Sequence, residues 1–433
     1  MSVVELAADG RLDELPEDVR RRFVARELPQ DADLVESVRG IVADVRRRGD
    51  EALLEQASAF DGVTLQRLEI PSERWTEALT SLPATVRAAL ERAVRNIETF
   101  HRAQLPEDVT VQVEPGVEVC RRWAPLARVG VYVPGGRAAY PSSVLMGVVP
   151  ARAAGVGDII VCSPPGPSGE PSPEVMAACA LSGATRLFAA GGAGAVAAMA
   201  YGTASVPAVD TIVGPGNKWV TEAKKQVAGH VPVDSPAGPS EVLVVADDSA
   251  DAEAVARELL AQAEHDPDAT AVLVSPNEAL IDQVRRLLSD WVPDEPRRDI
   301  IESALRSGGG LILTANIDQA LEFAEAYGAE HLCVMTHSAQ EHARRITTAG
   351  TIFVGEASSV AFGDYMTGAN HVLPTSGRAK SFSGLSAMNY LRSFTVQTLT
   401  RDGAARMADD VIALADAEGL PAHAAAARQR SRT

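Results

Sequence analysis

Between Ala127 and Gly355, short runs of aliphatic and β-branched residues alternate with helical patterns. There are nine such runs, and most end in glycine, proline or polar turn residues: ARVGVYVPGG, DIIVCSPPG, RLFAAGG, DTIVGPGN, EVLVVADD, ATAVLVSP, GLILTAN, HLCVMT and GTIFVG. Strands that alternate with helices predict an α/β fold with mostly parallel sheets covered on both faces. Because nine strands exceed one comfortable sheet, we expect two α/β units.

The two ends of the chain are helical in pattern. DLVESVRGIVADVRRRGDEALLEQASAF and PATVRAALERAVRNIETFHRAQL repeat apolar residues at three- and four-residue spacing within the first hundred or so residues. The last fifty residues return to this pattern with GAARMADDVIALADAEGL and end in an alanine-rich tail. We therefore expect helical segments on both sides of the α/β centre.

Composition excludes several classes of protein. The chain has 433 residues, with 40 Lys and Arg against 58 Asp and Glu, a net charge of −18. A nucleic-acid partner is not expected, because it requires a basic stripe. The four cysteines form no CxxC pair, and the N-terminus lacks the pattern of a signal peptide. The longest uncharged run contains Pro207 and fits a strand, turn and helix better than a membrane span. We expect a soluble, cytoplasmic protein with reduced thiols.

Four of the eight histidines lie in distinctive settings: QAEHDPD, GAEHLCV, GANHVLPT and GLPAHAAA. Gln262 and His265 are three residues apart on a helical pattern, so they share one face. Glu330 and His331 are adjacent where a loop enters a strand, and an acid beside an imidazole can produce a general base near neutral pH.

Each of these patterns, taken alone, is more often structural than functional. Asp364 precedes His371 in a loop rich in glycine and asparagine, where aspartate is commonly a turn former. Functional residues of open α/β sheets gather at the carboxyl ends of the strands, and we expect these residues there. By themselves the residues indicate an enzyme-like α/β protein, with a metal site as one option.

The segment VGPGNKWVTEAKKQV predicts a strand, a glycine-rich turn and a helix. Backbone amides at such a helix N-terminus suit an anion, although a tight turn explains the glycines equally well. The chain has no GxGxxG fingerprint of a dinucleotide site. Tyr132 ends a strand before Pro-Gly-Gly, which alone indicates packing.

Seven longer segments, taken together and in order, resemble the histidinol dehydrogenase family. They are VGVYVPGGRAAYPSSVLMGVVPARAAGV, GPGNKWVTEAKKQV, DSPAGPSEVLVVAD, LLAQAEHDPDA, YGAEHL, GTIFVGEASSVAFGDYMTGANHVLPT and EGLPAH. The resemblance extends from about residue 30 to residue 425 and is far more specific than any one motif.

The resemblance implies a homodimer with one Zn²⁺ per subunit that oxidises L-histidinol to L-histidine in two NAD-dependent steps. It implies general-base and water-activating roles for His331 and Glu330. The implied metal ligands are Gln262, His265, Asp364 and His423, and the further substrate contacts are Ser240, His371 and Glu418. A swapped C-terminal tail would bring His423 and Glu418 to the partner's site. A nucleophilic Cys120 or Cys162 is the less favoured chemistry.

For NAD, Tyr132 and Asn217 match the family's pattern, but Gly194 replaces its usual glutamine. GGAGAVAA stands where the family has GGAQAIAA, so one side-chain hydrogen bond to the cofactor is missing. The chain is also more basic than the family after HVLPTSG, at Arg378 and Lys380.

The fold implied by the resemblance has two incomplete Rossmann-like units and terminal helical segments that form the dimer. We expect a helical segment over residues 1–25, a larger substrate and metal domain over 26–129 and 240–385, an inserted NAD-side domain over 130–239, and a swapped helical tail over 386–433. Two alternatives remain: a metal- and NAD-dependent dehydrogenase of another primary alcohol, such as sulfopropanediol, and a metal-binding homologue without turnover.

Overall fold

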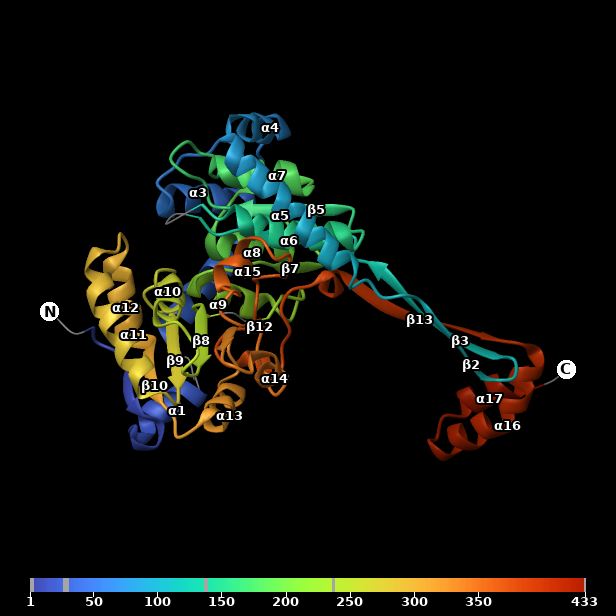
Figure 1. Cartoon of the computed structure of the whole chain (residues 1–433). Helices are drawn as coiled ribbons and strands as arrows, with labels where there is room; N and C mark the ends of the chain where they lie inside the picture. The colour runs from blue at the N-terminus through green and yellow to red at the C-terminus, as the bar shows by residue number, and fades with distance from the viewer. Residues whose placement is uncertain (1–3, 26–30, 136–138, 236–237, 432–433) are drawn as a thin grey trace.

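The computed structural model describes residues 4–25, 31–135, 139–235 and 238–431, and its strands form three sheets (Figure 1). Two of the sheets are entirely parallel, with six and four strands, and the third is antiparallel with three. The predicted α/β class with parallel sheets is confirmed, and all nine predicted strands are present. No helix within the described residues is both long and apolar enough to cross a membrane.

The six-stranded sheet has the order β1-β10-β9-β8-β11-β12. Its strands are β1 (Ala8–Arg11), β8 (Glu241–Ala246), β9 (Thr270–Ser275), β10 (Gly309–Leu313), β11 (His331–Met335) and β12 (Thr351–Val354). Apart from β1, which pairs with β10 at one edge, the chain enters the sheet at β8, adds β9 and β10 on one side and then β11 and β12 on the other. This reversal is the pattern of a doubly wound sheet.

Helices cover both faces of this sheet, as the uninterrupted apolar strands require. They are α1 (Glu17–Ala25), α10 (Ala252–Ala263), α11 (Glu278–Trp291), α12 (Arg298–Gly308), α13 (Ile317–Tyr327), α14 (Ala339–Ala343) and α15 (Val360–Tyr365). One face packs in a core cluster with α10, α11 and α12, and the other packs with α1 and α13.

The four-stranded sheet has the order β6-β5-β4-β7, which reverses between β4 and β7. Its strands are β4 (Arg128–Tyr132), β5 (Asp158–Ser163), β6 (Arg186–Ala189) and β7 (Thr211–Val213). Its covering helices are α2 (Ala32–Arg48), α3 (Asp50–Phe60), α4 (Ser72–Ser81), α5 (Ala84–Arg102), α6 (Pro141–Ala153), α7 (Pro173–Ser182), α8 (Gly192–Tyr201) and α9 (Lys218–Val227). Residues 32–102 thus pack on this sheet, whereas the predicted division grouped them with residues 240–385.

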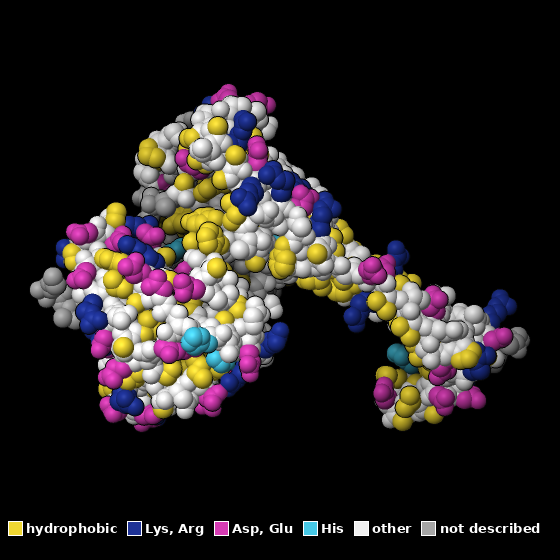
Figure 2. Space-filling view, viewed as in Figure 1, with side chains coloured by type: hydrophobic (Ala, Val, Ile, Leu, Met, Phe, Trp, Pro, Cys, Tyr) yellow, Lys and Arg dark blue, Asp and Glu magenta, His cyan; other side chains and the backbone are white. Residues whose placement is uncertain are grey.

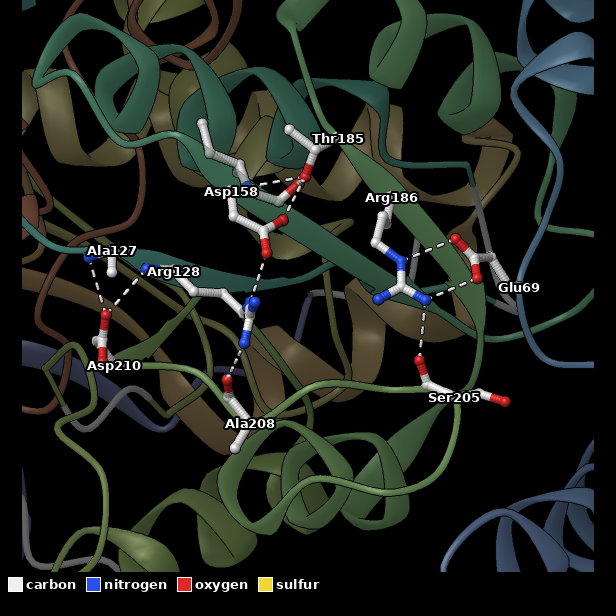
Figure 3. A network of polar contacts seen from close by, with 10 residues as sticks. Glu69, Ala127, Arg128, Asp158, Thr185, Arg186, Ser205, Ala208 and Asp210 are labelled. Carbon is white, nitrogen blue, oxygen red and sulfur yellow. Dashed lines mark hydrogen bonds and ion pairs between the residues drawn. The ribbon is translucent and has the colours of Figure 1, made fainter.

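Charged side chains pair at the amino ends of the four-stranded sheet (Figure 3). Arg186, at the start of β6, donates to both carboxylate oxygens of Glu69, at 2.8 and 2.7 Å. Arg128, at the start of β4, pairs with Asp158 at the start of β5. The hydrogen bond with Arg186 lowers the pKa of Glu69. These pairs stabilise the edge opposite the one where β4 and β7 end.

The N-terminal prediction needs one correction. Residues 1–25 were expected to be helical, but Ala8–Arg11 forms β1, which pairs in parallel with β10. The sequence ADGR has low β-propensity. The strand forms because its backbone completes the hydrogen bonding of the sheet edge, a tertiary effect that local sequence does not encode.

The third sheet forms an arm that leads away from both parallel sheets (Figure 1). It pairs β3 (Val117–Pro125) with β2 (Val109–Glu114) on one side and β13 (Leu391–Leu399) on the other. Beyond β13, the helices α16 (Arg401–Ala417) and α17 (Pro421–Arg430) form the tip. The tail predicted over 386–433 is therefore helical only after a nine-residue strand.

Large apolar side chains are exposed along this arm, as Figure 2 shows. They are Val109, Val111, Val113, Phe394, Val396, Leu399, Val411, Leu414 and Leu420. A patch of this kind marks an interaction surface.

Candidate active site

The residues predicted to carry the chemistry meet at the amino ends of the six-stranded sheet, which corrects the expectation that they gather at carboxyl ends. Ser240 directly precedes β8, and Glu330 directly precedes β11, whose first residue is His331. Gly328 ends α13 in the left-handed conformation, with φ of 66°, so the chain turns into β11 within two residues. His265 lies in the turn from α10 to β9. The last residues of helices α10 and α15 lie at this same edge.

Two buried glutamates are locked together between β8 and β11. The Glu241 amide donates to Glu330 Oε2 at 2.8 Å, and the Glu330 amide donates to Glu241 Oε1 at 3.1 Å. Only 1% of Glu241 and 4% of Glu330 is exposed. This exchange ties the backbone of Glu330, directly before His331, to the start of β8.

The His331 ring is fixed in one tautomer. Its Nδ1 lies 3.1 Å from the Glu241 carbonyl oxygen, which only accepts, so Nδ1 carries the proton and Nε2 has a free lone pair. Nε2 is buried, lies 3.7 Å from Asp364 Oδ1, and has no hydrogen-bond partner among the described residues. Burial lowers the pKa of His331 to about 4, against the opposing effect of Asp364. The imidazole is therefore neutral over a wider pH range than an imidazole with the near-neutral pKa expected from the sequence.

Asp364, His371 and His265 surround this ring. The His371 Nδ1 donates to the Asp364 carbonyl oxygen at 3.0 Å, which ties the end of α15 to the following loop. Burial lowers the pKa of His371, while Asp364 opposes the shift and His265 adds to it. His265 and His371 also each lower the pKa of His331. These four side chains, from three separate segments, therefore share one electrostatic environment.

Gln262 belongs to the same cluster through α10. It follows Glu258 by one turn and so shares its helical face. Glu258 accepts from the Val360 amide at 3.1 Å and contacts Asp364 electrostatically, which shows that this face packs against α15. Gln262 is 3% exposed, and its Nε2 has no hydrogen-bond partner among the described residues.

Tyr132 and Asn217 lie at the carboxyl ends of β4 and β7, beside the point where the four-stranded sheet reverses. The Tyr132 hydroxyl accepts from the Gly192 amide at 3.2 Å, and burial raises its pKa to about 12. Asn217 Oδ1 accepts from the Trp219 and Val220 amides at 3.0 and 3.3 Å. Asn217 thus caps α9 and occupies amides that an anion would use, which leaves its Nδ2 to donate elsewhere.

A buried ion pair holds the start of the loop that carries Asn217. Lys224 Nζ lies 2.5 Å from both Asp234 Oδ1 and the Gly214 carbonyl oxygen, and Asp234 Oδ2 accepts from the Gly214 amide at 2.7 Å. Gly214 has φ of 112° and lies directly against the Tyr132 backbone, where a Cβ would overlap it. The pair therefore positions Tyr132 and Asn217 relative to each other.

The last two predicted site residues, Glu418 and His423, lie at the tip of the arm. Glu418 ends α16, and His423 is in the first turn of α17. Figure 1 places both helices far from α10 and from β8 and β12, the strands on either side of β11. Within one chain, the structure therefore brings together Gln262, His265, Glu330, His331, Asp364 and His371, but not the tip residues.

Comparison with known proteins identifies the family of this chain. The family described as histidinol dehydrogenase matches residues 24–431. The chain belongs to the histidinol dehydrogenase family. It is accordingly an oxidoreductase enzyme.

Relatives within the family match over most of their length. The histidinol dehydrogenase of Methanothermobacter thermautotrophicus is 47% identical over 400 residues, which are 92% of this chain and 94% of that protein. The protein of the same name from Thermobifida fusca is 48% identical over 404 residues, 92% of each chain. The crystal structure of histidinol dehydrogenase from Elizabethkingia anophelis superposes with a TM-score of 0.92 at 33% identity, covering 98% of both chains.

The donor set of this histidinol dehydrogenase family member fits the expected metal. Imidazole, carboxylate and carboxamide groups without thiolate suit Zn²⁺, and they also suit Mn²⁺ or Co²⁺. Buried polar atoms without partners, such as Gln262 Nε2 and His331 Nε2, are expected where a site receives a substrate, whereas Gln262 would hold a metal through its Oε1. A separate group of Asp247, Asp248 and His337 lies largely exposed after β8 and β11, at the opposite edge of the sheet.

Neither cysteine considered as a nucleophile fits that role. Burial raises the pKa of Cys162 to about 12, so its thiol is not a nucleophile near neutral pH. Cys120 is on β3 in the arm.

Three positioning residues escaped the sequence analysis: Glu241, Lys224 and Asp234. Glu241 could have been noticed as an acid that follows Ser240 at a strand start. Nothing local distinguishes Lys224 or Asp234 from surface charges.

Proposed function

We propose that this chain catalyses the zinc- and NAD-dependent oxidation of L-histidinol to L-histidine through histidinaldehyde, the last steps of histidine biosynthesis. The observation that carries the proposal is the buried His331, whose lone pair on Nε2 faces Asp364, in a chain of the histidinol dehydrogenase family. We also propose that the two parallel-sheet units are incomplete Rossmann-like units and that the enzyme works in the cytoplasm.

The groups that the chain itself does not contain supply two kinds of chemistry. When bound, NAD accepts a hydride in each oxidation, and Zn²⁺ acts as a Lewis acid toward the substrate. Gln262, His265, Asp364 and His423 would hold the metal, and Tyr132 and Asn217 would contact NAD. Support comes from the unpartnered carboxamide of Gln262 and from the position of Tyr132 and Asn217 at a strand-order reversal.

His331 acts as the general base in the first oxidation. Its Nε2 takes the proton from the hydroxyl oxygen of the substrate, while the carbon that bears this oxygen loses a hydride and the carbon–oxygen double bond forms. The Glu241 carbonyl keeps the other ring nitrogen protonated, so the accepting nitrogen always faces the substrate. A base in this arrangement contributes about 10²–10⁴-fold to the rate.

Glu330 assists the second oxidation, in which the aldehyde adds water before it loses another hydride. Glu330 helps to remove a proton from that water. Its Oε2 lies 3.5 Å from His331 Nδ1, so its charge also stabilises the imidazolium after proton uptake. Ser240, His371 and Glu418 are the further substrate contacts, and a carboxylate among imidazoles suits a cationic amino alcohol.

We propose a homodimer in which each arm completes the partner's site. Glu418 and His423 belong to the tip of the arm, where α16 and α17 lie far from the six-stranded sheet (Figure 1), so they do not act in their own chain. The exposed apolar side chains of the arm need a covering surface, and a second copy of the chain would provide one. This arrangement supplies the fourth metal ligand to each site.

One rival substrate class has an observation in its favour. Lys380 packs its stem beside Gly328, three residues before His331, with Cε 3.1 Å from the position of a Cβ on that glycine. A sulfonate-bearing alcohol such as sulfopropanediol would use such a cation, together with Arg378. A third candidate is a metal-binding homologue without turnover, against which the complete cluster around His331 argues.

The deciding experiment counts the NADH formed per L-histidinol by metal-replete protein run to completion, with and without a chelator. About two NADH per substrate, abolished by the chelator and restored by Zn²⁺, is the expected result. Turnover with a sulfonated diol but not with L-histidinol would favour the rival. Absence of turnover with every alcohol would indicate the inactive homologue.

A further inference from the structure

The first turn of α8 contains a space that the chain fills from another helix. Gly194 lies in this turn, after β6 and two residues beyond Gly192, whose amide donates to the Tyr132 hydroxyl. A Cβ at Gly194 would overlap Gln56 Oε1 and would lie 3.2 Å from Leu53 Cδ2. A side chain at position 194 and the present position of Gln56 therefore exclude each other.

Gln56 reaches this place because α3 packs against α8. Leu53 is 4% exposed and belongs to the same core cluster as the α8 residues and Tyr132, which anchors the helix. Gln56 is half-buried at the rim of this contact. Asp61, just after α3, interacts electrostatically with Tyr132, so the end of α3 lies near that side chain.

The carboxamide of Gln56 has unused hydrogen-bonding capacity. It makes no hydrogen bond among the described residues, although it offers two donors and an acceptor. Because the side chain is only partly buried, its amide groups remain accessible and can bond to a ligand that lies beside them.

We propose that Gln56 is a cofactor-binding residue: its carboxamide supplies the hydrogen bond to NAD that a glutamine at position 194 would otherwise make. This inference rests on the proposed NAD-dependent function. Gly194 is then not a defect of the NAD site. It is the small residue that lets an amide enter the same space from α3.

The test compares NAD⁺ binding by calorimetry, and KM for NAD⁺ against kcat, for Gln56→Met, Gln56→Ala and the double variant Gln56→Ala with Gly194→Gln. Loss of one neutral hydrogen bond, about 1 kcal/mol, corresponds to about a five-fold weaker affinity. We expect this loss in both single variants with kcat unchanged, and recovery to within about two-fold in the double variant. Ser58→Ala, an exposed position on the same helix, is the control.

Each outcome distinguishes the two proposals. Gln56→Met keeps the packing volume, so an unchanged affinity for NAD⁺ in this variant would show that Gln56 merely fills space, and the inference would be wrong. A correctly folded double variant that binds no better than Gln56→Ala would overturn it as well. If the unmodified chain neither binds NAD⁺ nor reduces it, the proposed function fails, and the inference fails with it.

Discussion

Replacing His331 with asparagine removes the catalytic nitrogen while it keeps the structural one. In the unmodified chain the imidazole Nδ1 lies 3.1 Å from the Glu241 carbonyl oxygen. The asparagine Nδ2 would lie close to the position of that Nδ1, so it can still donate to this carbonyl. The position of Nε2, 3.7 Å from Asp364 Oδ1, becomes empty of any base. The backbone exchange between Glu241 and Glu330 does not involve the ring and is retained.

The expected loss follows from this separation of roles. General-base catalysis contributes about 10²–10⁴-fold, or roughly 2.7–5.5 kcal/mol of the activation free energy. The variant is therefore expected to reduce kcat by that factor, with NAD⁺ affinity unchanged. The assay is steady-state NADH formation at saturating L-histidinol and NAD⁺, followed by a single-turnover measurement of the first hydride transfer.

His101→Asn is the matched control. His101 is fully buried in α5, and burial lowers its pKa to about 4, as for His331, but it lies outside the candidate site. Its replacement is expected to affect stability and leave kcat within a factor of two or so of the unmodified chain. A kcat for His331→Asn within about ten-fold of the unmodified chain would refute the assignment of His331 as the base.

Three further predictions address the arm, the loop that carries Asn217, and the stability of the protein in acid. A chain that ends before Glu418 is expected to lose both zinc binding and turnover, whereas a chain that ends after Ala427 keeps both. The zinc content of the two chains is measured after gel filtration. Equal zinc content would contradict the shared site. Lys224→Met leaves the buried Asp234 carboxylate unpaired, so it is expected to lower the free energy of unfolding, measured in denaturant, by about 3–5 kcal/mol. Most of this loss should be recovered when Asp234→Asn is added. A loss below about 1 kcal/mol would show that the ion pair does not hold the loop. Glu69→Gln is expected to reduce the free energy of unfolding by about 0.5–1 kcal/mol at pH 7, since the Glu69 side chain is 44% exposed. Because Arg186 lowers the pKa of folded Glu69, this stabilisation is complete above the unfolded pKa of about 4.3 and disappears as the pH falls through the folded value, so unfolding curves of the two proteins should converge in acid.

The parallel strands were predictable because each is buried on both faces. Such strands read as continuous aliphatic runs, and EVLVVA in β8 is buried at every position. The arm strands were missed for the opposite reason. All six residues of β2 are exposed in this chain, and the strand alternates Val109, Val111 and Val113 with polar residues. That period of two was a usable signal for an exposed strand, but it was overlooked beside the helical patterns.

The site could be predicted only as a set of residues, because its geometry depends on distant segments. Gln262 and His265 share a helical face by spacing, yet nothing in the sequence indicates that this face packs against Asp364, about a hundred residues later. The edge of the sheet was predicted wrongly, since the rule for carboxyl ends describes Tyr132 and Asn217 but not His331. The low pKa of His331 likewise arises from burial, which the adjacent Glu330 did not reveal.

The arm has a genetic consequence. In the proposed homodimer, Glu418 and His423 of one chain enter the site that contains His331 of the other chain. No single polypeptide therefore forms a whole catalytic centre. A chain without the tip and a chain with an altered His331 would each be inactive alone. Mixed, they would form a pair in which one centre has both halves intact and the other has neither. Activity would therefore be restored when the two inactive chains are mixed and lost again when dilution separates them. This complementation would follow directly from the position of the tip residues at the end of the arm.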